Sequence, residues 1–137
     1  MEINLQRKNK AFHYEATNPD KIIVNIDANV AIGGEGKGVR PMELVLMGLG
    51  GCASIDLGLI LKKQKQELED YRLTITATRK DNVAKTFDTI NLDFLLWGKL
   101  DNEKVEKAIG LTLTKYCSVA LSLSNEIKIT SSFKINH

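Results

Sequence analysis

The chain is poor in the residues from which most metal and hydrolytic sites are built. Its 137 residues hold two cysteines and two histidines. Cys52 and Cys117 stand alone, without the C-x-x-C or H-x-x-x-H spacing of a metal site. His13 lies on an early predicted strand, His137 is the last residue, and no G-x-S-x-G motif indicates a serine hydrolase. We therefore expect no bound metal and no cofactor.

The charge balance is also close to neutral. The formal net charge is +2, and the densest cluster of lysines, KKQKQELED at 62–70, carries acidic residues as well. This balance argues against a nucleic-acid or anionic-membrane partner. The first ten residues, MEINLQRKNK, contain no apolar stretch typical of an export signal. Two cysteines without such a signal favour a reducing compartment, so we expect a cytoplasmic protein.

The glycine-rich stretch GGEGKG at 33–38 does not match a nucleotide-binding loop. A phosphate-binding loop needs a serine or threonine after its lysine, but Lys37 is followed by Gly38. The spacing G-x-G-x-x-G of dinucleotide-binding loops is absent too. The stretch is predicted to be a flexible connector.

The longest apolar run is LVLMGLGGCASIDLGLIL at 44–61. Its length is at the lower limit of a membrane span, which needs roughly 17–25 residues. Asp56 would cost about 2.5–3.5 kcal/mol at the centre of a bilayer, and four glycines dilute the hydrophobicity. The run therefore favours a buried helix, and no membrane association is expected.

Hydrophobic periodicity predicts the order βββ-α-ββ-α-β. Apolar residues alternate with polar ones in the strands and recur about every four residues from Val105 to Ala120 in the second helix. Asp101 is predicted to cap the start of that helix. Pro41 suits the first turn of the first helix. The order indicates an α+β fold with antiparallel sheet and two central buried helices, in a single domain over 1–137. The predicted segments are a three-stranded meander over 2–28, a helix over 41–66, strands over 71–80 and 86–98, a helix from 101 and a strand over 127–135.

The two cysteines remain as candidates for chemistry. Each lies on a predicted helix among small residues, in GLGGCAS and KYCSVA, so the two thiols could meet in the core. At about 100° per residue, Ile55, Asp56 and Leu59 lie near the Cys52 face of the first helix. An isolated cysteine is also a common core residue. Burial alone raises a thiol pKa, so a reactive Cys52 requires a cation or hydrogen-bond donor from elsewhere in the fold.

Two stretches resemble the OsmC/Ohr family of osmotically inducible and organic hydroperoxide resistance proteins. They are RPMELVLMGLGGCASIDL at 40–57 and KYCSVALSLSNEIKIT at 115–130. Pro41, Cys52 and Cys117 fit the family pattern of a proline-led helix that bears a cysteine and a second cysteine at the head of a late helix. The chain is most similar to the uncharacterised YhfA-like branch. The resemblance implies an OsmC-like fold and an intertwined homodimer.

The resemblance also implies a mechanism. Cys52 would attack an organic hydroperoxide and become a sulfenic acid, and Cys117 would resolve it to a disulfide. A dithiol, dihydrolipoyl in the hydroperoxide-resistance branch, would then reduce the enzyme.

Active members place a glutamate directly after the proline, paired with an arginine of the N-terminal sheet. Here Met42 takes that position and Glu43 follows one residue later, so Glu43 is the candidate acid. The candidate arginine is Arg7, in the first hairpin, with Arg40, which precedes the helix, as the alternative.

A second interpretation belongs to another class of protein. The chain could form an OsmC-like dimer without peroxidase activity that binds a small apolar ligand in the groove beside Cys52.

Overall fold

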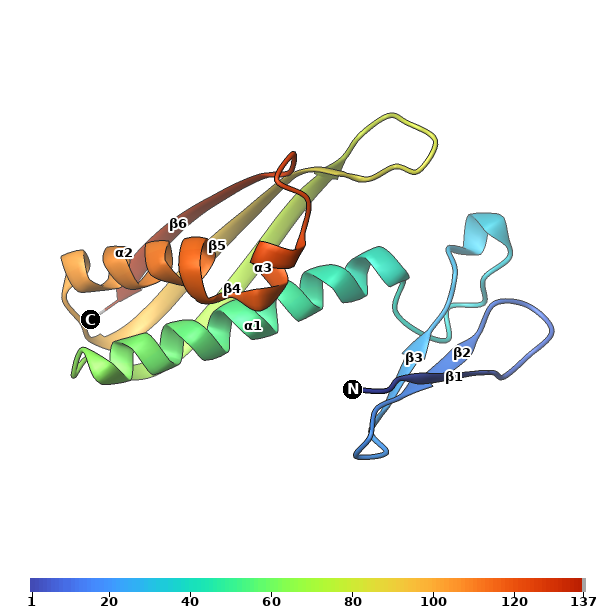
Figure 1. Ribbon diagram of the computed structural model, residues 1–137, viewed down its shortest axis with the longest axis horizontal. Helices are drawn as coiled ribbons and strands as arrows, with labels where there is room; N and C mark the ends of the chain where they lie inside the picture. Colours follow the sequence, from blue (N-terminus) through green and yellow to red (C-terminus); the bar gives the residue numbers. More distant parts are fainter. Residues whose placement is uncertain (137) are drawn as a thin grey trace. The chain divides into compact units, whose positions relative to one another are not determined.

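The computed structural model describes residues 1–136, which form two compact units, Met1–Met47 and Gly48 onward (Figure 1). Each unit contains a three-stranded sheet. The predicted single domain over 1–137 stays a prediction. The α+β class is confirmed, with the strands and helices in the order that the alternation and the four-residue repeat predicted.

The first unit contains the predicted antiparallel meander. Its strands are β1 (Asn4–Arg7), β2 (Tyr14–Thr17) and β3 (Ile23–Ile26), and β2 is the central strand. Both pairings are antiparallel, with Arg7 opposite Tyr14 and Tyr14 opposite Ile26. The alternation over 2–28 predicted short strands joined by turns, and the structure has this arrangement.

A buried carboxylate organises the glycine-rich connector. Asp27 is 1% exposed and follows β3 directly. Its carboxylate accepts the backbone N–H groups of Ala28, Glu35 and Lys37 at 2.7, 3.2 and 3.0 Å. The N–H of Lys37, more than the other two, lowers the pKa of Asp27. The connector, which also includes the short helix η1 (Val30–Ile32), is therefore tethered to one anionic side chain.

Helix α1 (Pro41–Lys63) begins at the proline, as predicted, and ends three residues before the predicted end at 66. Lys62 and Lys63 lie in its last turn, where cations interact favourably with the helix dipole. Lys65 has φ 56°, the left-handed conformation that commonly terminates a helix.

The second sheet consists of β4 (Glu67–Arg79), β5 (Phe87–Lys99) and β6 (Lys128–Asn136), with β5 in the centre. β4 and β5 are antiparallel, as predicted. β6 runs parallel to β5, so the expectation of purely antiparallel sheet was wrong at this strand. The reason is the helical segment between β5 and β6, which returns the chain to the starting end of β5 as parallel crossovers do.

The core of the second unit lies between the helices and one face of this sheet (Figure 1). α1 contributes a stripe with four-residue spacing, and β5 contributes alternate residues to the same core. A Cβ atom at Gly50 would lie 2.9 Å from Cδ1 of Ile75 on β4, so glycine lets α1 approach the sheet closely. The most deeply buried apolar side chains of the two elements, each at most 2% exposed, are Leu49, Ala53, Leu57, Leu61, Ile90, Leu92, Phe94 and Leu96.

The opposite face of α1 is exposed in the single chain. Ile55 and Leu59 are 66% and 58% exposed. α1 was expected to be a buried helix, but within the single chain only one of its faces is buried. By length and composition α1 could also cross a membrane, with a mean hydropathy of 2.0, but core helices of soluble proteins pass the same test.

The late helix is interrupted, although the four-residue repeat continues to Ala120. Asp101 caps α2 (Asn102–Leu111) by accepting the N–H of Lys104, as predicted. The chain then forms one wide turn, η2 (Thr112–Tyr116). Cys117 is extended, and α3 (Ser118–Ser122) starts after it.

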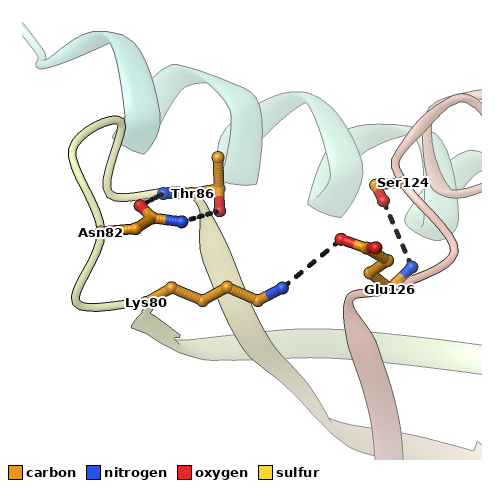
Figure 2. Close-up of polar contacts among 5 residues, drawn as sticks. All are labelled: Lys80, Asn82, Thr86, Ser124 and Glu126. Carbon is orange, nitrogen blue, oxygen red and sulfur yellow. Dashed lines mark hydrogen bonds and ion pairs between the residues drawn. The ribbon is translucent and has the colours of Figure 1, made fainter.

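The loop between β4 and β5 is tied to the segment that leads into β6 (Figure 2). Lys80 forms an ion pair with Glu126 at 3.5 Å. Within the loop, Asn82 donates to the Thr86 hydroxyl and accepts the Thr86 N–H, both at 3.4 Å. The Ser124 hydroxyl accepts the N–H of Glu126 at 3.2 Å. Because the ion pair is partly exposed, it contributes at most about 1 kcal/mol.

Candidate functional site

The fold of the second unit brings the two cysteines together. The Sγ atoms of Cys52 and Cys117 and a carboxylate oxygen of Asp56 all lie within 4.8 Å of one another. Cys52 is half-buried, Cys117 is fully buried, and both are free thiols. The two predicted cysteines, 65 positions apart in the chain, therefore share one site.

The position of Cys52 is fixed by the helix that bears it. Ala53 is fully buried in the core, so the neighbouring Cys52 lies at the edge of the buried stripe of α1. A half-buried thiol at such an edge is held in place by packing and remains open to a small molecule. Asp56 follows one helical turn later and projects on the same side as Cys52.

The position of Cys117 is fixed by the interruption of the late helix. Its N–H donates to the carbonyl of Thr112 at 2.7 Å, which closes the wide turn η2. Its Sγ accepts the N–H of Ala120 at 3.4 Å, so the thiol itself is the N-cap of α3. The wide turn therefore places Cys117 in the core, with the first turn of α3 next to Cys52.

Cys52 lies next to hydrogen-bond donors at the start of α3. Its Sγ is 3.6 Å from the hydroxyl oxygen of Ser118. The backbone N–H of Val119 lowers the pKa of the Cys52 thiol most, the hydroxyl and N–H of Ser118 and the Cys117 thiol lower it further, and burial opposes them. Unpaired N–H groups at a helix start are natural partners of an anion, so they stabilise the thiolate.

The surroundings of Cys117 shift the pKa of its thiol in the opposite direction. Burial raises the pKa of its thiol to about 11, and the neighbouring Cys52 raises it as well, against a smaller lowering by the N–H of Ala120. When Cys52 ionises, Cys117 therefore keeps its proton. The site contains one thiol disposed to be a nucleophile and one disposed to stay neutral.

Asp56 and Ser118 are the residues of this site to which the sequence assigned no role. The carboxylate oxygen Oδ2 of Asp56 accepts from the Cys52 thiol at 3.9 Å. Asp56 was expected on the Cys52 face, and its position four residues later was the available signal. Ser118 directly follows Cys117 at the head of a helix, but its approach to Cys52 depends on the packing of α3, which no local pattern reveals.

The candidate activating pair has other partners. The carboxylate of Glu43 accepts the N–H of Arg40 at 2.8 Å, which caps the start of α1. The Arg7 guanidinium donates to the carbonyls of Lys10 and Ala11 in its own hairpin. Among residues 1–136 no ion pair joins Arg7 to Glu43. A catalytic role for either residue stays a prediction.

The cluster of Cys52, Asp56 and Cys117 also has the chemistry of a partial metal site. Two thiols and a carboxylate are ligand types that zinc accepts, and the three ligand atoms lie within 4.8 Å of one another. A closed structural zinc site takes four ligands. Spacing in the sequence gave no sign of this cluster, because its members come from two distant segments. The expectation that no metal is bound stays a prediction.

Fold and site together define an α+β protein in which two thiols of unequal acidity share one site. The chain belongs to the OsmC-like protein family, whose model matches residues 34–132. It is 40% identical to protein YhfA of Escherichia coli over 100 residues, which cover 72% of this chain and 75% of the relative. The resemblance noted in the sequence is thereby confirmed.

Solved structures show the same fold. A hypothetical protein from Aquifex aeolicus VF5 is 28% identical and superposes with a TM-score of 0.82, over 99% of this chain and 97% of that protein. An organic hydroperoxide resistance protein OsmC from Legionella pneumophila superposes with a TM-score of 0.75 at 17% identity, over 98% and 97% of the two chains. At that identity the second comparison concerns the fold alone.

Proposed function

We propose that this protein is a two-cysteine thiol peroxidase that reduces organic hydroperoxides in oxidative stress defence. One observation supports the proposal above all. Two free thiols lie within 4.8 Å of each other, and their surroundings move their pKa values in opposite directions. In a two-cysteine peroxidase one ionised thiol attacks the peroxide, and a second thiol nearby condenses with the sulfenic acid. Relatives of the same fold are named as hydroperoxide resistance proteins.

The first step uses Cys52. Its thiolate attacks the terminal oxygen of ROOH, an S–O bond forms and the O–O bond breaks. The alkoxide RO⁻ leaves and is protonated to the alcohol, and Cys52 becomes a sulfenic acid. Sulfur is oxidised by two electrons, and the peroxide is reduced by two.

The second step uses Cys117. Its sulfur attacks the sulfenic sulfur of Cys52, the S–O bond breaks, and hydroxide leaves with the Cys117 proton as water. The two Sγ atoms must approach from within 4.8 Å to the length of an S–S bond, about 2.05 Å. A dithiol reductant, of the dihydrolipoyl type in a related branch, then restores both thiols by exchange.

The surroundings of Cys52 suit an organic peroxide. Ile55 and Leu59 follow Cys52 on α1 and are more than half exposed, so they offer apolar surface to a hydrocarbon tail. The same exposed face, together with Leu121 on α3, suits a homodimer interface. We propose a homodimer in the cytoplasm, without a nucleic-acid or membrane partner.

The experiment compares peroxide consumption by the wild-type protein, Cys52→Ser and Cys117→Ser, with cumene hydroperoxide as the organic substrate and hydrogen peroxide as the small one. The wild type should consume cumene hydroperoxide faster, and Cys52→Ser should abolish the reaction. Cys117→Ser should complete one turnover and accumulate a sulfenic acid at Cys52 that dimedone traps. A wild-type rate no higher than that of free cysteine would refute the proposal.

A second function is favoured by one observation. Arg7 and Glu43 are both occupied by backbone groups of their own segments, so the activating pair of active relatives is not formed within the described chain. A dimer without turnover would bind a small apolar ligand beside Cys52. Native mass spectrometry of the purified protein would then show a bound ligand, whereas fast peroxide turnover by a ligand-free dimer would exclude this function.

A further inference from the structure

Asp56 is the one side chain of the cysteine cluster that the proposed reaction has not used. We propose that Asp56 is the proton carrier of the peroxidase reaction: it takes the proton of the Cys52 thiol and delivers it to the leaving alkoxide oxygen of the peroxide. The inference rests on the proposed function and assigns to this chain a catalytic residue that the cysteine chemistry alone does not include.

The carboxylate lies beside the reacting atom. Asp56 Oδ2 is 3.9 Å from Cys52 Sγ, a distance at which the thiol can donate to it. Asp56 also lies within 4.8 Å of Cys117 Sγ. The carboxylate therefore borders the space that the oxygen atoms of a peroxide must occupy when the terminal oxygen meets Cys52.

The groups around the Cys52 sulfur are of two kinds. The start of α3 presents donors, the hydroxyl of Ser118 at 3.6 Å and the N–H groups of Ser118 and Val119. Asp56 presents an acceptor. Donors stabilise a thiolate, but a carboxylate repels it. A carboxylate would be the wrong group if the role of Asp56 were only to stabilise the thiolate. Its presence here fits a group that moves a proton.

The proton balance of the step closes with Asp56 included. The Cys52 thiol transfers its proton to the carboxylate, and the sulfur attacks the terminal oxygen, which keeps its own hydrogen. The O–O bond breaks, and Asp56 returns the proton to the alkoxide as it leaves. The products are a Cys52 sulfenic acid and an alcohol, and Asp56 is again a carboxylate. An alkoxide is a poor leaving group, so a positioned acid accelerates this step.

The test separates proton delivery from thiolate formation with three reagents on Asp56→Asn. Alkylation by iodoacetamide needs the thiolate but no proton for its leaving iodide. Perbenzoic acid releases benzoate, which also needs no proton. Cumene hydroperoxide releases an alkoxide, which does. In the variant, solvent can take the thiol proton before iodoacetamide or perbenzoic acid reacts, and no carboxylate repels the thiolate. The variant should therefore be alkylated at Cys52 at least as fast as the wild type, should reduce perbenzoic acid at a similar rate, and should reduce cumene hydroperoxide about a hundredfold more slowly.

Two further variants complete the design. Asp81→Asn removes one carboxylate from an exposed loop position and should leave all three rates unchanged. Asp56→Glu keeps a carboxylate near the sulfur and should recover part of the lost cumene hydroperoxide rate, which separates a missing proton carrier from a misfolded protein.

Each other result overturns the inference. Equal cumene hydroperoxide rates in Asp56→Asn and the wild type would show that Asp56 carries no proton. A similar fall in all three rates would show that Asp56 acts on the structure of the site. If the wild-type protein itself reduces cumene hydroperoxide no faster than Cys52→Ser, the proposed function fails and the inference fails with it.

Discussion

Removal of the Ser118 hydroxyl should make Cys52 less reactive. In the structure this hydroxyl lies 3.6 Å from the Cys52 sulfur and lowers the pKa of the thiol. A hydrogen bond to a charged group contributes about 1.5–3 kcal/mol. Because this contact is long and Cys52 is half-buried, we expect about 1 kcal/mol for Ser118→Ala. Since 1.36 kcal/mol corresponds to a tenfold change, the thiolate fraction below the thiol pKa should fall about fivefold.

The assay is the rate of iodoacetamide alkylation at Cys52 as a function of pH, with the modified peptide quantified by mass spectrometry. Near neutral pH, Cys52 of Ser118→Ala should be alkylated about fivefold more slowly than Cys52 of the wild type. The two rates should converge at high pH, where Cys52 is ionised in both proteins. Ser122→Ala, which changes an exposed serine at the end of α3, is the matched control. An unchanged or higher rate at neutral pH in Ser118→Ala would refute a donor role for this hydroxyl.

Three further predictions concern stability. The pKa of Asp27 is lowered, so its contribution to stability is complete above the unfolded-state value of about 3.9 and is lost as the pH falls through the folded-state value. Urea midpoints should therefore fall less on acidification in Asp27→Asn than in the wild type, and an equal fall in both proteins would contradict this role. Gly51→Ala should raise the unfolding free energy by up to about 1 kcal/mol through helix propensity, because a Cβ there meets nothing within 4 Å; a lower midpoint in urea would indicate that another chain packs at this position. Asp101→Ala should lower the unfolding free energy by about 1 kcal/mol, because it removes the side chain that accepts the N–H of Lys104 at the start of α2. Thermal unfolding measures this change, and an unchanged melting temperature would contradict the capping role.

The strands and the first helix were predictable because their signals are local. Alternation located β5 to within one residue, and Pro41 marked the start of α1. The interruption at η2 (Thr112–Tyr116) was not predictable. A four-residue repeat records which residues are apolar but not whether the backbone stays helical between them. The parallel pairing of β6 has a separate cause, the helical crossover between β5 and β6. The crossover helix was predicted, but its effect on the direction of the last strand was not.

The candidate site divides in a similar way. Cys52 and Cys117 were identified by their small neighbours and by the family resemblance, and the structure brings them together. The sequence also indicated that a reactive Cys52 needs a donor from elsewhere. Spacing could not identify that donor, because Ser118 reaches Cys52 only through the tertiary packing of α3 against α1. The resemblance suggested Arg7, whose guanidinium instead binds its own hairpin.

The most direct test of the two-cysteine mechanism is the intact mass of the protein under non-reducing conditions, before and after one equivalent of cumene hydroperoxide. Conversion of two thiols to one disulfide should lower the mass by about two units, and peptide mapping should recover Cys52 linked to Cys117. An unchanged mass with two free thiols, or a gain of one stable oxygen without the disulfide, would contradict the mechanism.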